Sequence, residues 1–154
     1  MQKGQRNSMK LYDNMNIKFD TLAPCGVYCG ACPSFNKTCK GCATDDKEQD
    51  RCSKWSCKIR NCCYNLKGLD YCVYCELFPC KIINKKLFST HQDEPRFTYR
   101  YEIPDVFAKL KKMGVENYLD FQIQRWKCNS CGGTIQFYLY KCNTCGKEQM
   151  INQI

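Results

Sequence analysis

The chain has 154 residues, sixteen of them cysteines, and a formal net charge of +9. That length suits one ordinary domain, or one small domain with an added module. Residues 1–20 hold no apolar signal-peptide core, and no stretch reaches the ~20 apolar residues that span a bilayer, so we expect a cytoplasmic protein without membrane contact. In a reducing cytosol thiols stay free, which favours metal binding over a disulfide scaffold.

The positive charge is weak evidence for nucleic-acid binding, because the formal count takes every cysteine as neutral. A metal-bound cysteine is a thiolate. Four zinc sites with four thiolates each would carry sixteen negative and eight positive charges, and their net −8 would reduce the +9 to about +1. We therefore expect many of the lysines and arginines to be counter-charges to thiolates.

Four segments are predicted along the chain. Residues 1–21 form a polar leader, 22–84 a cysteine-rich metal-binding domain, 85–126 a connector with two helices, and 127–154 a zinc-ribbon-like module. The predicted fold class is small α+β and metal-stabilised, with an irregular or helical N-terminal domain, a two-helix connector and a C-terminal zinc-ribbon-like β-hairpin. Between Cys25 and Cys80 there are twelve cysteines but eight residues of Ile, Leu, Val, Phe and Met, so metal must replace much of the core.

The cysteine-rich segment contains three C-x2-C pairs, each of which can hold a metal from one side of a turn. These pairs are Cys29/Cys32, Cys39/Cys42 and Cys72/Cys75. Single thiols that would complete the coordination shells are Cys25, Cys57, Cys62 and Cys80. Twelve thiols divide into three four-ligand sites, but spacing does not determine the pairing. Cys52 and Cys63 are the least motif-like, so two sites with spare thiols are the alternative.

Cys25, Cys29 and Cys32 have the C-x3-C-x2-C spacing of radical S-adenosylmethionine enzymes. About 120 residues follow Cys32, too few for the partial barrel of such an enzyme, and no Gly-Gly-Glu-like stretch is present. The second triplet of a binuclear zinc DNA-binding module with six cysteines is missing, and so are the C-x2-C-x2-C-x3-C-P runs of two-cluster ferredoxins. An iron–sulfur cluster in the Cys25–Cys80 region stays open as an alternative to zinc.

Short helices are expected over residues 52–68, ending at Gly68, and after Pro79. Residues 85–103 are expected to be a partly extended connector. In it the aromatic residues of 97–101 alternate with arginines, which fits an edge strand better than a single-stranded nucleic-acid binder. His91, the only histidine, is expected to face solvent rather than to be a ligand or a base.

Two longer helices are predicted next. Over residues 104–113, Pro104 suits the first turn and Gly114 the stop. The residues expected on the packing face of this helix are Val106, Leu110 and Met113. Those expected on the packing face of a second helix, over residues 115–126, are Val115, Leu119, Ile123 and Trp126.

The strongest signal is a pair of C-x2-C-G turns ten residues apart. Their thiols are Cys128, Cys131, Cys142 and Cys145. Two such turns facing each other make a closed tetrahedral site of four sulfurs without an open coordination position, which is typical of structural zinc; rubredoxin-like iron is the main alternative. The residues between the turns alternate as in a strand, with Ile135, Phe137 and Leu139 on one side.

Five motifs, taken in order, resemble the cysteine-rich family known as domain of unknown function 3795. They are "CGVYCGACPSF", "CKGC", "CKIRNC", "KGLDYCVYCELFPC" and "GVENYLDFQIQRWKCNSCGG". The similarity runs from about Cys25 to Cys145 and implies zinc binding without an assigned activity. The ligands that it implies are Cys25, Cys29, Cys32, Cys39, Cys42, Cys57, Cys62, Cys72, Cys75 and Cys80. Cys52 and Cys63 have no firm counterpart in the pattern.

No P-loop, G-x-G-x-x-G or G-x-S-x-G motif is present, and no residue set favours catalysis. We interpret the chain as a protein that binds several zinc ions in structural four-cysteine sites and serves as a binding or adaptor module for a protein or an RNA. Two alternatives stay open. One is an iron–sulfur redox or maturation protein that uses the Cys25–Cys80 region. The other is a metal sensor or carrier that uses the spare thiols Cys52 and Cys63.

Overall fold

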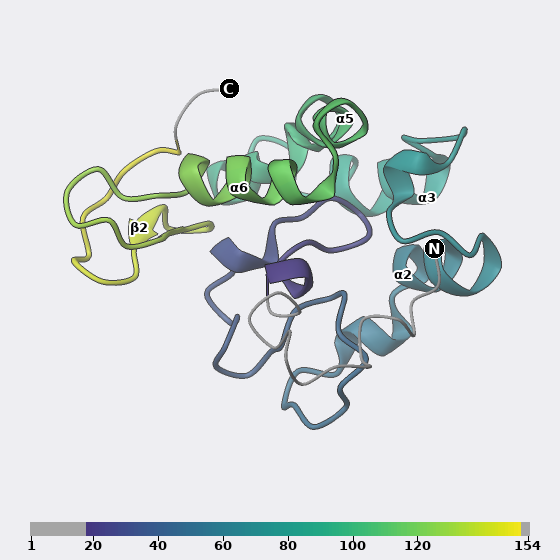
Figure 1. The fold of residues 1–154 in the computed structure, drawn as a ribbon, viewed down its shortest axis with the longest axis horizontal. Helices are drawn as coiled ribbons and strands as arrows, with labels where there is room; N and C mark the ends of the chain where they lie inside the picture. Colours follow the sequence, from purple (N-terminus) through teal and green to yellow (C-terminus); the bar gives the residue numbers. More distant parts are fainter. Residues whose placement is uncertain (1–17, 152–154) are drawn as a thin grey trace.

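The computed structural model describes residues 18–151, so most of the predicted leader lies outside the described residues (Figure 1). Short helical turns dominate the first half, two longer helices follow, and a small hairpin ends the described chain. In chain order the elements are η3 (Cys29–Ala31), η4 (Ser53–Ser56), α2 (Lys58–Asn61), η5 (Cys62–Leu66), η6 (Cys72–Tyr74), α3 (Lys81–Ile83), η7 (Asn84–Phe88), η8 (Pro95–Phe97), α4 (Thr98–Tyr101), α5 (Ile103–Met113), α6 (Val115–Arg125), β1 (Ile135–Gln136) and β2 (Lys141–Cys142).

The predicted helices of the cysteine-rich segment are present. α2 and the π-helical η5 run on from residue 58 to residue 66, and Gly68 follows at a φ of +64°. α3 and η7 follow Pro79 in the same way. A left-handed φ costs glycine little, which is why the first of these helical stretches ends where Gly68 stands.

The two longer helices confirm the predicted connector pair, but part of their predicted packing face is wrong. Pro104 lies in the first turn of α5, and Gly114 separates α5 from α6 at a φ of +81°. Met113 is 36% exposed and Ile123 is 43% exposed, so neither lies in the core. Their predicted places are taken by Phe107 in α5 and Tyr118 in α6, both fully buried.

A buried polar chain explains the shifted face of α6. Gln122 is 2% exposed, and its side-chain amide donates to the Tyr118 hydroxyl at 2.9 Å. The Gln122 amide oxygen accepts from the Trp126 indole N–H at 3.1 Å. Because both ends of the amide are hydrogen-bonded, a glutamine can lie where a hydrophobic pattern predicts solvent.

The predicted extended connector is wrong, because residues 95–101 are helical. Pro95 begins η8, because the fixed φ of proline suits a first helical turn, and α4 follows directly. Phe97 and Tyr99 are both buried, so they pack inward from a helix rather than from an edge strand. His91 is exposed as predicted, with its ring nitrogen 2.9 Å from the Glu94 carboxylate.

The hairpin at the C-terminal end is shorter than the predicted alternation. β1 pairs antiparallel with β2, with Ile135 opposite Cys142. Tyr138 and Tyr140 have φ values of +76° and +52°, which break the strand. Leu139 is 74% exposed, so its predicted place beside Ile135 and Phe137 is wrong. The two helices and the hairpin together confirm the small α+β class.

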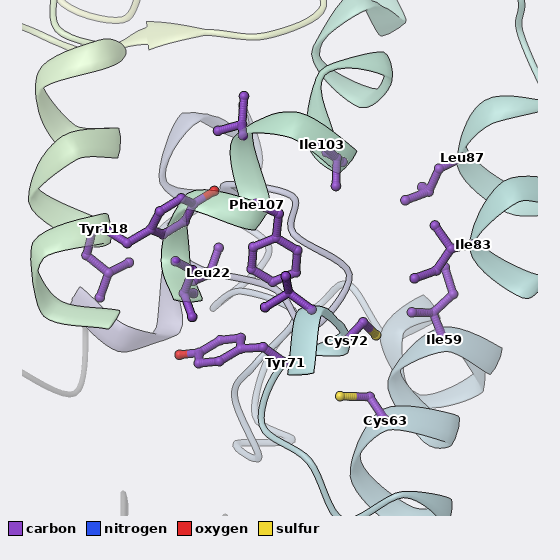
Figure 2. Close-up of a cluster of buried hydrophobic side chains, with 14 of the residues drawn as sticks. Leu22, Ile59, Cys63, Tyr71, Cys72, Ile83, Leu87, Ile103, Phe107 and Tyr118 are labelled. Carbon is purple, nitrogen blue, oxygen red and sulfur yellow. The ribbon is translucent and has the colours of Figure 1, made fainter. Parts of the chain in front are cut away.

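Two buried clusters hold the chain together. The first joins α5 and α6 to the cysteine-rich segment and contains the thiols Cys63 and Cys72 among its apolar side chains (Figure 2). The second joins the hairpin to the segment around η3: Phe137 is 2% exposed, and its N–H donates to the Ala31 carbonyl at 3.0 Å. The hairpin loop therefore packs directly against the cysteine-rich segment. None of the helices within residues 18–151 has the length and apolar character needed to cross a membrane.

Candidate metal centres

The four thiols of the C-terminal turns converge on one point; we call this group the tetrad. Its members are Cys128, Cys131, Cys142 and Cys145, whose sulfurs all lie within 4.8 Å of one another. The sulfurs of Cys128 and Cys145 are 3.8 Å apart, and those of Cys131 and Cys142 are 3.4 Å apart. Tetrahedral coordination at a metal–sulfur distance of about 2.3 Å places neighbouring sulfurs about 3.8 Å apart. The tetrad therefore has the size of a site for one metal ion.

Backbone amides point at the sulfurs of the tetrad. The N–H groups of Ser130, Gly133 and Thr144 donate to the thiol two residues earlier at 3.3–3.4 Å. Backbone N–H donors, first that of Cys145 and then that of Thr144, lower the pKa of Cys142 to about 6. A metal ligand must be a thiolate, so these turns favour the form that binds metal.

Six thiols of the N-terminal half surround a second feature, which we call the large cavity. It has a volume of about 330 Å³. Its thiols are Cys25, Cys29, Cys32, Cys39, Cys42 and Cys57. Within residues 18–151 the tetrad is the one group of three or more His, Cys, Asp or Glu side chains whose ligand atoms lie within 4.8 Å of one another. The six thiols therefore stand around a space instead of meeting at a point.

Cationic side chains lie against the large cavity. Lys54 is 4% exposed, and its ammonium group donates to the Cys39 sulfur at 2.9 Å. The ammonium group of Lys86 donates to the Cys57 sulfur at 3.2 Å. A hydrogen bond with Cys29, opposed by burial and assisted by the charge of Lys54, lowers the pKa of Cys42 to about 6. Burial raises the pKa of Cys25, so the thiols of this cavity differ in acidity.

Five further thiols line a small cavity of about 30 Å³ between the helical turns. They are Cys62, Cys63, Cys72, Cys75 and Cys80. The neighbouring Cys63 thiol and burial raise the pKa of Cys72, and Figure 2 shows both side chains in the buried cluster. The Cys63 thiol itself donates to the Leu69 carbonyl at 3.2 Å. Apolar side chains such as Ile59 and Phe78 form much of the remaining wall.

All fourteen cysteines predicted as ligands lie in the tetrad or around one of the two cavities. Cys52 is the sixteenth and stands apart: it is exposed, and its thiol donates to the Gln49 and Asp50 carbonyls. Cys63 was not predicted, yet it lies in the small cavity. The signal for it was helical spacing, because Cys63 follows Ile59 by one turn and both are 3% exposed. Which thiols bind metal stays a prediction.

Comparison with known proteins gives one match. Residues 34–85, about a third of the chain, match the model of a family described as a protein of unknown function (DUF3795). The match confirms the resemblance, over a shorter stretch than expected. No curated protein and no solved structure matches the chain. The match thus supports a likeness to the DUF3795 family over residues 34–85, and a zinc-ribbon-like segment lies beyond it.

Proposed function

We propose that this chain is a multi-site zinc protein in which structural metal holds a binding or adaptor module together. The tetrad supports the proposal most directly, since four sulfurs within 4.8 Å of one another fit one tetrahedral ion. Four protein thiolates fill that shell and leave no position for substrate, so its ion would be a scaffold rather than a reaction centre.

The hairpin needs such an ion. Its strands have two residues each, and a two-stranded hairpin is at best marginally stable in water. Structural zinc contributes about 10–16 kcal/mol of apparent binding energy in small peptides, which is folding energy where the apo form is unfolded. With zinc in place, the hairpin loop can present Phe137 to the cysteine-rich segment.

A second zinc ion is proposed for the small cavity, where four of the five thiols would have to draw closer together to bind it, because in the described residues three or more ligand atoms lie within 4.8 Å of one another only in the tetrad. The volume of the small cavity is about 30 Å³, about a tenth of that of the large cavity, which favours a single ion over a multi-iron cluster. Five thiols surround it, one more than a tetrahedral zinc ion requires.

The test is the metal content of the purified full chain and of two cysteine variants. Cys142→Ala removes a buried tetrad thiol and should lower the zinc content by about one ion per chain, with a large fall in melting temperature. Cys52→Ala removes the exposed thiol outside the three groups and should leave both quantities unchanged. Equal zinc content in Cys142→Ala and the unmodified protein would refute zinc in the tetrad; a red, zinc-free protein with one iron would replace zinc by rubredoxin-like iron.

The adaptor role is tested by its partner class. Binding to single-stranded RNA should weaken steeply as salt rises, because phosphate contacts release counterions. Binding that is independent of salt would exclude a role for phosphate contacts, and absence of RNA binding would leave protein as the partner class.

A further inference from the structure

The six thiols of the large cavity are spaced for a group larger than a zinc ion. Every zinc ion held by four thiolates requires sulfurs about 3.8 Å apart, including each ion of a two-zinc, six-thiolate centre. The tetrad meets this requirement. Around the large cavity no three of the six sulfurs lie within 4.8 Å of one another. A single ion could not reach four of them.

The large cavity, which these thiols line together with other side chains, is large enough for an inorganic core. Its volume of about 330 Å³ far exceeds the about 10–15 Å³ of cavity that a single water molecule needs. A [4Fe–4S] core has eight atoms and binds each thiolate through a different iron, so its ligands stand around a polyatomic centre. The arrangement of the thiols and the volume of the cavity that they line both fit a polyatomic metal cluster.

A buried lysine indicates that the centre is anionic. Lys54 is 4% exposed, and a buried ammonium group is costly unless an anion lies beside it. Its polar contacts are the Cys39 sulfur and the side-chain oxygen of Gln49. The ammonium group also lies 5.8 Å from the centroid of the Trp55 ring, and a thiolate shell around a metal cluster would add the anionic partner that a buried ammonium group favours.

We propose that the large cavity holds a [4Fe–4S] cluster bound by four of its six cysteines, and that Lys54 donates to the thiolate shell of that cluster. The proposal goes beyond the structural zinc of the tetrad and does not depend on it. Phe137 and Tyr138 of the hairpin loop also line the cavity, so the ribbon covers one side of the cluster. Hydrogen bonds, charge and solvent exposure are the quantities by which a protein sets a cluster's reduction potential.

The test begins with the full chain purified without oxygen, or reconstituted with equal amounts of ferrous and ferric iron and with sulfide. We expect a brown protein with about four iron and four sulfide per chain, beside zinc in the tetrad. The variant Cys25→Ala/Cys29→Ala/Cys42→Ala leaves three thiols at the cavity, one fewer than the cluster needs. It should lose the colour and the sulfide while keeping the zinc of the tetrad, and Cys52→Ala should keep both.

A second variant leaves every cysteine in place and so guards against a simple failure to fold. Lys54→Met should assemble the cluster but release iron to a chelator about tenfold faster, because partners of metal ligands change metal affinity by about 10–100-fold. A colourless protein with zinc alone, or a triple cysteine variant that keeps its sulfide, would overturn the cluster. Iron release from Lys54→Met at the rate of the unmodified protein would overturn the role of the lysine. Loss of zinc from Cys142→Ala, measured separately, reports on the tetrad alone.

Discussion

Phe137 is the side chain through which the hairpin loop packs on the rest of the chain, and we expect Phe137→Ala to destabilise the whole protein. The ring is 2% exposed and stacks on Tyr99 with a centroid distance of 4.0 Å and an interplanar angle of 7°. Its ring centroid also lies 6.0 Å from that of Trp126, in an edge-to-face arrangement. The main-chain bond from Phe137 to Ala31 survives the change, so the variant removes the ring alone.

The magnitude follows from the burial. Truncation of a buried phenylalanine to alanine costs about 3–5 kcal/mol, and the two ring contacts place this residue within that range rather than below it. For a chain of this length each 1 kcal/mol lowers the melting temperature by about 2–4 °C, so we expect a fall of roughly 6–20 °C. That loss is a large share of the about 5–15 kcal/mol that stabilises a typical domain.

The assay is thermal unfolding followed by circular dichroism on metal-loaded protein, with Leu139→Ala as the matched control. Leu139 lies in the same loop but is 74% exposed, so its truncation should change stability by less than about 0.5 kcal/mol. Zinc content measured on both variants shows that the tetrad stays loaded. If the two variants melt at the same temperature, the ring does not anchor the loop and the packing argument fails.

Two further matched pairs test the fold. Gly26→Ala places a methyl group 2.6 Å from the Phe107 ring, and it should lower the free energy of unfolding by about 1–3 kcal/mol more than Gly68→Ala does. Gly68 shares the positive φ but has no neighbour within 4 Å, so equal unfolding midpoints in urea would contradict this prediction. Ile83 is 1% exposed, so Ile83→Ala should lower the free energy of unfolding by about 2–5 kcal/mol. The adjacent Ile82 is 38% exposed, so Ile82→Ala should lower it far less. The reverse order in the same urea titration would mean that the core lies on the other face of α3.

Features set by neighbouring residues could be predicted from the sequence. The tetrad needs two tight turns and a short hairpin, and its four thiols lie within 18 residues of one another. The bounds of α5 follow from Pro104 and Gly114, which act within one helical turn. In both cases the cause lies in the segment itself, and the structure agrees with the prediction.

Features set by distant contacts could not be predicted in this way. The aromatic residues of 97–101 alternate as in a strand, but Tyr99 is stacked on Phe137, 38 positions later, and the segment is a helix. Leu139 is exposed because Tyr138 and Tyr140 have left-handed φ values, and no turn motif in the sequence predicts those values. Short aromatic runs carry too few residues for their period to decide between strand and helix.

The grouping of the N-terminal thiols has the same cause. Cys57 is 32 positions from Cys25, and the two line one cavity because the chain between them folds back. The spacing of cysteines along the sequence identified the C-x2-C pairs but gave no distances between the sulfurs of different pairs. Those distances decide whether the thiols can share one zinc ion or require a larger cluster. The sequence could therefore indicate metal chemistry while leaving the kind of metal centre open.

The charge of the chain can now be related to particular contacts. The formal +9 suggests nucleic acid only if the cysteines are neutral. In the structure the ammonium groups of Lys54 and Lys86 are directed at the sulfurs of Cys39 and Cys57, at 2.9 Å and 3.2 Å. Cations held at thiols are not available to phosphates. The formal charge is thus weak evidence for a nucleic-acid partner, because some of the cations that produce it are directed at thiols inside the protein.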